Sequence, residues 1–314
     1  MIDVQNLPVN VIGRSDELSR EVWLALRDRG IGGSEAAAVC GLSKWGSPLT
    51  VYMRKKGMLP EVEDNEDMEF GREAESFIRD WFGRKLGVQT STFPYIMQSV
   101  DYPWMLANID GLVNDGKVRL LEIKTAGPWA RKEWEEGIPD AYRAQVQHYM
   151  TVTGIDSAYV VGLVGKKLFW HLQEYNAELA AQIVEAEQAL WEMIENNEMP
   201  APIGIDAEVE ALTYGDVDPD AVEEGDDEAV ALYQEASIMI KELEKRKTEL
   251  KADMLYKMGS AKTLITPTYK VLHLQSEREY FDKKAFRKEL PDIYQRFAER
   301  RRTDMGLRVY EVKK

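Results

Sequence analysis

The stretch Asp110-Gly-Leu-Val-Asn-Asp-Gly-Lys-Val-Arg-Leu-Leu-Glu122-Ile-Lys124 decides the fold of this chain. Its middle, Asn114-Asp115-Gly116, is a strong signal for a tight hairpin turn. The runs on either side, 105–113 and 117–125, have the apolar content that is typical of strands. We therefore predict two adjacent antiparallel strands that are joined at this turn.

Three charged side chains of the hairpin are expected to meet. Glu122 and Lys124 share one strand face because they are two residues apart, and strand pairing brings Asp110 beside Glu122. Carboxylates suit Mg²⁺ or Mn²⁺, and the chain has too few Cys and His residues to favour zinc. Beside a metal, Lys124 would orient or deprotonate a water that attacks a phosphodiester, and the cation would lower its pKa. The alternative is a surface hairpin with ordinary charges, because E-x-K tripeptides are common in acidic proteins.

Composition limits the class of protein. At 314 residues and 44% hydrophobic content, the chain is long enough for one large or two small globular domains. The single cysteine, Cys40, excludes a disulfide framework and a four-cysteine iron–sulfur cluster, and it predicts a reducing cytoplasm. The sequence shows neither a signal peptide nor an apolar run of about 18 residues, so no membrane association is expected.

The net charge of -15 is distributed unevenly. Residues 205–240 hold 12 acids and no base, whereas residues 241–314 hold 20 Lys and Arg against 12 acids. A DNA-binding protein needs only a local basic surface, so overall acidity does not exclude one. We expect an arginine cluster to contact the DNA backbone or a neighbouring subunit, with a solvated helix as the alternative. It comprises Arg296, Arg300, Arg301, Arg302 and Arg308.

Helical and strand-like segments alternate along the first two thirds of the chain, which predicts an α/β core with a mixed central sheet flanked by helices. The expected helices are 16–29, a short one capped by Ser34, 48–56, 68–86, 129–136, 139–153 and one ending at Asn196, and the expected strands are 93–100, 105–113, 117–125, 157–164 and 167–175. Residues 61–69 read as an exposed link.

Three regions are expected along the chain. Residues 1–200 form the core, and 201–228 form an acidic linker because like charges and few large apolar groups disfavour ordering. Residues 229–314 form a C-terminal appendix, with a long charged helix to about 258, two strands around Pro267, two short helices and a last strand at 307–312.

Six segments in order resemble the YqaJ-type viral recombinases, which are lambda-type phage exonucleases of the restriction-endonuclease-like PD-(D/E)xK superfamily. These segments are Trp23-Leu-Ala-Leu-Arg27, Gly32-Gly-Ser-Glu35, Gly71-Arg-Glu-Ala-Glu75, Asp110-Gly111, Glu122-Ile-Lys124 and Tyr142-Arg-Ala-Gln-Val-Gln147. They lie within residues 20–175. The chain departs from the pattern at Ile109, where a proline often precedes the first aspartate; that proline shapes the backbone and binds no metal.

The resemblance implies further residues of a metal-dependent active site. Glu75 matches the helical glutamate that reaches the metal, with Glu73 as the competing residue. The carbonyl of Ile123 is implied as an additional ligand. Gln145 and Tyr142 lie one helical turn apart, so they project from one face toward the same phosphate.

A second group of residues is expected to bind a DNA end. Ser34 follows two glycines at a predicted helix start, where free backbone amides and the helix dipole favour an anion. The resemblance implies that Arg27, seven residues earlier, binds a 5′-terminal phosphate together with Ser34; Arg29 is the alternative. It also implies that Trp23 packs near the frayed terminus.

The implied function is 5′→3′ digestion of one strand of duplex DNA, which leaves a 3′ single-stranded tail for recombination. The resemblance further implies a homo-oligomeric ring, for example a trimer, and a single-strand annealing protein as partner. Two alternatives stay open. One is a metal-dependent endonuclease with the same centre, and the other is a DNA-binding or assembly module without catalysis.

Overall fold

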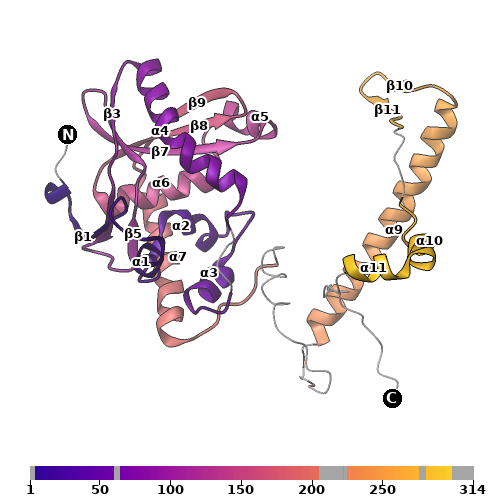
Figure 1. Ribbon diagram of the computed structural model, residues 1–314, viewed down its shortest axis with the longest axis horizontal. Helices are drawn as coiled ribbons and strands as arrows, with labels where there is room; N and C mark the ends of the chain where they lie inside the picture. Colours follow the sequence, from indigo (N-terminus) through magenta and orange to yellow (C-terminus); the bar gives the residue numbers. More distant parts are fainter. Residues whose placement is uncertain are drawn as a thin grey trace. The chain divides into compact units, whose positions relative to one another are not determined.

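The computed structural model describes residues 4–59, 64–204, 222, 225, 227–275 and 281–298 (Figure 1). Backbone contacts divide the chain into two units, Met1–Asp216 and Val217–Lys314, and the division falls inside the segment expected as a linker. Most of that segment lies outside the described residues. The same holds for the expected strand 307–312 and for four arginines of the basic cluster, Arg300, Arg301, Arg302 and Arg308.

A five-stranded mixed sheet forms the centre of the first unit. Its strands, in spatial order, are β3 (Gln89–Ser91), β6 (Gly111–Asn114), β7 (Val118–Ala126), β8 (Ser157–Val164) and β9 (Lys167–Glu174). Strands β7 and β8 are parallel, and the other neighbours are antiparallel. This arrangement confirms the mixed central sheet predicted from the sequence.

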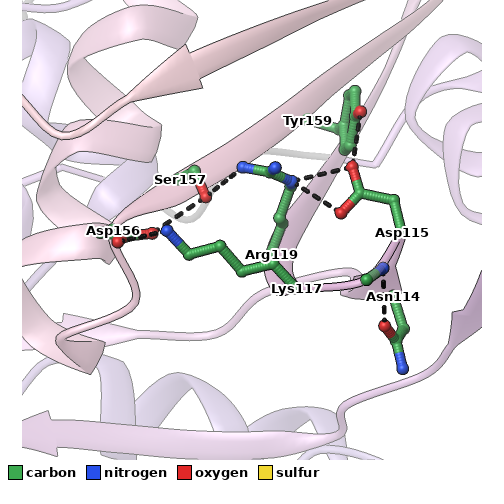
Figure 2. A network of polar contacts seen from close by, with 8 residues as sticks. Asn114, Asp115, Lys117, Arg119, Asp156, Ser157 and Tyr159 are labelled. Carbon is green, nitrogen blue, oxygen red and sulfur yellow. Dashed lines mark hydrogen bonds and ion pairs between the residues drawn. The ribbon is translucent and has the colours of Figure 1, made fainter.

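Polar contacts fix the hairpin at its turn (Figure 2). Asp115 accepts hydrogen bonds from Arg119 Nε at 2.9 Å and from the Tyr159 hydroxyl at 3.0 Å, so the turn is joined to β8. Arg119 also donates to Ser157 Oγ at 2.7 Å. The resulting register pairs Gly111 with Leu121, which places Asp110 opposite Glu122 at the other end of the hairpin.

A second sheet of four strands was only partly predicted. Its order is β1 (Val9–Arg14), β4 (Tyr95–Ser99), β5 (Met105–Ala107) and β2 (Ile31–Gly32). The single strand expected at 105–113 is wrong, because β5 and β6 belong to different sheets and the chain passes between them at 108–110. Strands β1, β2 and β3 were not predicted. They are short, and their pairing depends on partners that are distant in sequence.

Helices surround both sheets. The helical elements of the first unit are η1 (Val4–Asn6), α1 (Arg20–Arg27), α2 (Gly33–Val39), α3 (Pro48–Lys55), α4 (Glu66–Leu86), η2 (Pro128–Ala130), α5 (Arg131–Glu136), α6 (Asp140–Thr153) and α7 (Ala177–Asn196).

Three helix starts differ from the sequence expectation, each for a capping reason. Helix α1 begins at Arg20 and not at residue 16, because Ser19 is its N-cap and accepts from Val22 N. Helix α4 begins at Glu66, inside the expected link, because Asn65 caps it. The N-cap of α2 is Gly32, so Ser34 lies inside the helix and its hydroxyl is available for another contact.

Helices α4 and α6 cover opposite faces of the central sheet (Figure 1). Ile78 and Phe82 of α4 pack with Leu121 and Ile123 of β7. On the other face, α6 contributes Val146 and Met150 to a cluster that includes Leu120. The alternation predicted for β7 is confirmed, and it turns Glu122 toward α6.

The second unit contains α9 (Asp227–Met258), the hairpin of β10 (Thr263–Ile265) and β11 (Lys270–Leu272), α10 (Lys283–Glu289) and α11 (Pro291–Phe297). The long helix and the hairpin agree with the sequence expectation. The apolar side of α9 stays largely exposed, including Met239, Leu243 and Leu250. None of the described helices combines the length and apolar composition needed to traverse a bilayer.

Two glycines of the first unit are expected to respond to alanine in opposite ways. A Cβ atom at Gly33 would lie 2.4 Å from Cε1 of Tyr149, so Gly33→Ala should lower the free energy of unfolding by about 1–3 kcal/mol. At Gly71, inside α4, the nearest atom would be Thr125 Oγ1 at 3.5 Å, an ordinary contact. Gly71→Ala should therefore raise stability by about 0.5–1 kcal/mol. Urea unfolding measures both, and equal effects would contradict the packing of α2 on Tyr149.

Candidate active site

Asp110 lies directly before β6, where the chain enters the central sheet. Its Oδ2 accepts a hydrogen bond from the backbone N of Ile123 at 2.7 Å, which holds the carboxylate against β7. Burial raises the pKa of Asp110 above its ordinary value, although Lys124, this hydrogen bond and Arg79 act in the opposite direction. The carboxylate is thus held in place and poorly solvated.

Glu122 is the buried centre of the site, with 3% of its surface exposed. Its Oε1 accepts from Lys124 Nζ at 2.7 Å and from Gln145 Nε2 at 2.7 Å. Burial, with a further contribution from Asp110, raises the pKa of Glu122 to about 8 even though Lys124 opposes the shift. Its Oε2 is buried and has no hydrogen-bond partner among the residues that the structure describes.

Lys124 lies on the same face of β7 as Glu122, as the sequence predicted. Its Nζ lies 5.2 Å from the centre of the Tyr142 ring. Burial lowers the pKa of Lys124, but Glu122 and Asp110 outweigh this effect and the net pKa lies above the ordinary value. The expected lowering concerned a metal-loaded site; in the protein alone the carboxylates keep Lys124 protonated.

Helix α4 brings Glu75 to the site and leaves Glu73 exposed. Glu75 forms an ion pair with Arg79, one turn further along the same helix. Burial and the nearby charge of Asp110 raise the pKa of Glu75. The sequence analysis assigned no role to Arg79, a buried arginine whose charge lowers the pKa of Asp110. Its spacing of four residues from Glu75 on one helix was the available signal.

Helix α6 contributes further side chains to the site. Gln145 Nε2 donates to Glu122 and also to the Tyr149 hydroxyl, the latter at 3.1 Å. Tyr142 faces Lys124 one turn earlier, so the structure brings both predicted residues of this helix to the Glu122–Lys124 pair. Tyr149 was not predicted, although it lies four residues after Gln145.

Arg27 and Ser34 form a second group of contacts. Arg27 Nη2 donates to Ser34 Oγ at 2.7 Å, and the guanidinium lies 4.7 Å from the centre of the Trp23 ring. Trp23 Nε1 in turn donates to Asn108 Oδ1 at 3.3 Å. Arg29, the alternative, instead lines a separate groove beside Trp104. The structure therefore joins Arg27, Ser34 and Trp23 and leaves Arg29 apart.

A buried ion pair holds the backbone next to this second group. Lys55 Nζ lies 3.0 Å from Glu35 Oε2 and donates to the backbone carbonyl of Arg27 at 2.9 Å. Glu35 Oε2 also accepts from Gly32 N at 2.8 Å. These contacts fix the backbone on both sides of the Arg27–Ser34 pair. Sequence reasoning did not find Lys55, because nothing local links it to residues 28 positions away.

The donor set fits a hard divalent cation. Apart from burial, Asp110 raises the pKa values of both Glu75 and Glu122, and Glu75 also raises the pKa of Glu122, so the three carboxylates lie within electrostatic reach of one another. The unpartnered Oε2 of Glu122 is the atom that a cation would satisfy. Among the described residues, no three His, Cys, Asp or Glu side chains are already arranged as a metal-binding group; Glu122 is paired with Lys124, and Glu75 is paired with Arg79.

The mixed α/β fold of the first unit is shared with a solved exonuclease. A crystal structure of LHK-Exo in complex with dAMP superposes with a TM-score of 0.50 and 22% identity, over 57% of this chain and 94% of that one. The structure of this alkaline exonuclease from Laribacter hongkongensis was also determined separately and gives a TM-score of 0.48 over the same shares.

Sequence comparison identifies the family. Residues 22–156 match the YqaJ-like viral recombinase domain. The chain is 30% identical over 297 residues to the uncharacterized protein YqaJ of Bacillus subtilis (strain 168), covering 91% of this chain and 93% of YqaJ. The chain therefore belongs to the YqaJ-like viral recombinase family.

Proposed function

We propose that this protein is a metal-dependent exonuclease that digests one strand of linear duplex DNA from its 5′ end and leaves a 3′ single-stranded tail. One observation carries the proposal. Asp110, Glu122 and Lys124 meet in a buried centre where Glu122 Oε2 has no partner among the described residues. Membership of a viral recombinase family supports a role on DNA, and the alkaline exonuclease LHK-Exo shares the fold.

Each residue of the centre has a distinct part in phosphodiester hydrolysis. Asp110, Glu122 and Glu75 would hold Mg²⁺ or Mn²⁺, with the Ile123 carbonyl as an additional ligand. When bound, the cation supplies positive charge to the phosphate and promotes ionisation of water. Gln145 orients Glu122 by donating to its Oε1.

Lys124 acts as a cation and hydrogen-bond donor in this proposal. Its raised pKa keeps the ammonium protonated at neutral pH in the absence of metal. A protonated lysine stabilises charge that develops on the phosphate and orients the attacking water, while Tyr142 limits its movement. A role as the base would first require a metal to lower its pKa.

The Arg27–Ser34 pair would bind the 5′-terminal phosphate and so explain why digestion starts at a DNA end. A guanidinium and a hydroxyl 2.7 Å apart, on a backbone held by Glu35 and Lys55, offer several donors to a terminal phosphate. Trp23 stacks on the guanidinium and restricts its orientation. Because each cut by such an enzyme exposes a new 5′-phosphate, the same pocket receives the product of the previous cycle.

The remaining parts of the proposal rest on the family resemblance. We expect duplex DNA ends as substrate, a homo-oligomeric ring, for example a trimer, and a single-strand annealing protein as a recombination partner. The expected compartment is the cytoplasm of the host cell.

The test compares three DNA substrates in the presence of Mg²⁺. Linear duplex with 5′-phosphate ends should be degraded at least about tenfold faster than the same duplex with 5′-hydroxyl ends, since charge-assisted hydrogen bonds contribute about 1.5–3 kcal/mol. Arg27→Ala or Ser34→Ala should remove this preference. Arg29→Ala is the matched control and should keep this preference, because Arg29 lines a separate groove and Arg27 is the residue that donates to Ser34. Digestion of a covalently closed circle at the linear rate would establish an endonuclease instead.

A further inference from the structure

Tyr149 lies between the two halves of the proposed site, which are the centre around Glu122 and the Arg27–Ser34 pair. It belongs to α6, and 5% of its surface is exposed. Its hydroxyl accepts from Gln145 Nε2 at 3.1 Å, and the same nitrogen donates to Glu122 Oε1 at 2.7 Å. The tyrosine oxygen is therefore connected to the Glu122 carboxylate through one amide group.

The ring of Tyr149 supports the other half of the site. A Cβ atom on Gly33 would lie 2.4 Å from Cε1 of the ring, so the backbone at Gly33 rests directly on it. Gly33 is the first residue of α2, and the next residue is Ser34, whose hydroxyl accepts from Arg27. A displacement of Ser34 is thus transmitted to the Tyr149 ring, because closely packed groups have no free space to absorb it.

Charges of both halves act on the Tyr149 hydroxyl. Burial raises its pKa well above the ordinary value, Glu122 and Asp110 raise it further, and Arg27 lowers it. The hydroxyl therefore remains protonated and lies within electrostatic reach of the carboxylates on one side and of the arginine on the other. This agrees with the position given by the hydrogen bonds and the packing.

We propose that Tyr149 is a positioning residue that couples a terminal phosphate in the Arg27–Ser34 pocket to the alignment of Glu122, through the hydrogen bond with Gln145. The inference rests on the proposed function and deepens it. It makes the cleavage step, and not only binding, depend on the phosphate at the DNA end. With the pocket empty, the Ser34 hydroxyl is held by Arg27, and the additional constraint that a bound phosphate imposes on Ser34 and on the Tyr149 ring is missing. DNA with a 5′-hydroxyl end is therefore bound but cut slowly.

Tyr149→Phe tests the coupling, because phenylalanine keeps the ring against Gly33 and removes the hydroxyl. Two ratios between 5′-phosphate and 5′-hydroxyl duplexes are measured. One is the ratio of Kd values from fluorescence anisotropy without divalent metal, and the other is the ratio of cleavage rates at saturating DNA with Mg²⁺. We expect the cleavage ratio to fall about tenfold, the effect of losing one hydrogen bond of about 1.4 kcal/mol, while the Kd ratio stays within about twofold.

The matched control is Tyr159→Phe, which removes a hydroxyl that donates to Asp115 Oδ2 at 3.0 Å in the turn network (Figure 2). It should leave both ratios unchanged. If Tyr149→Phe keeps the cleavage ratio, with or without a lower Tm, the coupling is refuted while the proposed function stands. Loss of both ratios would also refute it, since Tyr149 would then only build the pocket. A wild-type protein with no phosphate preference would overturn the proposed function and this inference together.

Discussion

Replacing Lys124 with alanine is expected to lower the rate of DNA degradation by about three orders of magnitude. Two losses combine in this variant. The phosphate loses an ammonium group placed on the same strand face as Glu122, and Glu122 loses the cation that lies 2.7 Å from its Oε1 and lowers its pKa. More of the Glu122 carboxyl is then protonated at neutral pH, which weakens metal binding as well. Release of acid-soluble nucleotides from linear duplex DNA measures the rate.

Lys117→Ala is the matched control for Lys124→Ala. Lys117 belongs to the same hairpin and also pairs with a carboxylate, Asp156, at 2.5 Å, but it lies at the turn and not at the centre (Figure 2). Its removal should change the rate by less than about twofold, because exposed ion pairs contribute little. A Lys124→Ala enzyme with near wild-type activity would contradict the proposed centre and favour a DNA-binding module without catalysis there.

The parts of this site that the sequence predicts are those formed by local geometry. The turn at 114–116 and the alternation along β7 are properties of neighbouring residues, so the opposition of Asp110 and Glu122 follows from the hairpin alone. The strand expected at 157–164 is likewise confirmed as β8, since its apolar residues are neighbours in the sequence.

Other features depend on contacts between distant segments, which periodicity does not reveal. The run 105–113 has the pattern of one strand, yet its two halves belong to different sheets. Strand β5 pairs with β2 and β4, whereas β6 pairs with β3 and β7. Likewise, Lys55 reaches the carbonyl of Arg27 only after α1 and α3 have packed. In the sequence, Tyr149 cannot be distinguished from an ordinary core aromatic, because its close contact with Gly33 exists only in the folded structure. The residues that support a site are therefore harder to predict than those that carry its chemistry.

The pKa of Glu122, about 8, predicts a second large effect, which depends on pH. The ordinary value is 4.5, so between pH 4.5 and about 8 the folded protein binds a proton that the unfolded chain releases. The free energy of unfolding of the metal-free protein should therefore fall as pH rises through this window and level off above it. The contribution of Glu122 is of the order of a few kcal/mol, since one pH unit corresponds to about 1.4 kcal/mol.

Glu122→Gln isolates this contribution, because Asp110, Glu75 and Lys124 remain and a buried neutral amide replaces the titrating carboxyl. The variant should lose at least about three orders of magnitude in cleavage rate yet gain stability relative to wild type as pH rises from 5 to 8. For wild type, Mn²⁺ binding requires the ionised carboxylate, so affinity should rise by up to about tenfold per pH unit to pH 8. Calorimetry in buffers of different ionisation enthalpy should show about one proton released per metal at pH 7. Parallel stability curves for the two proteins would show that Glu122 is ionised throughout, in which case the unpartnered Oε2 would carry its charge without a metal.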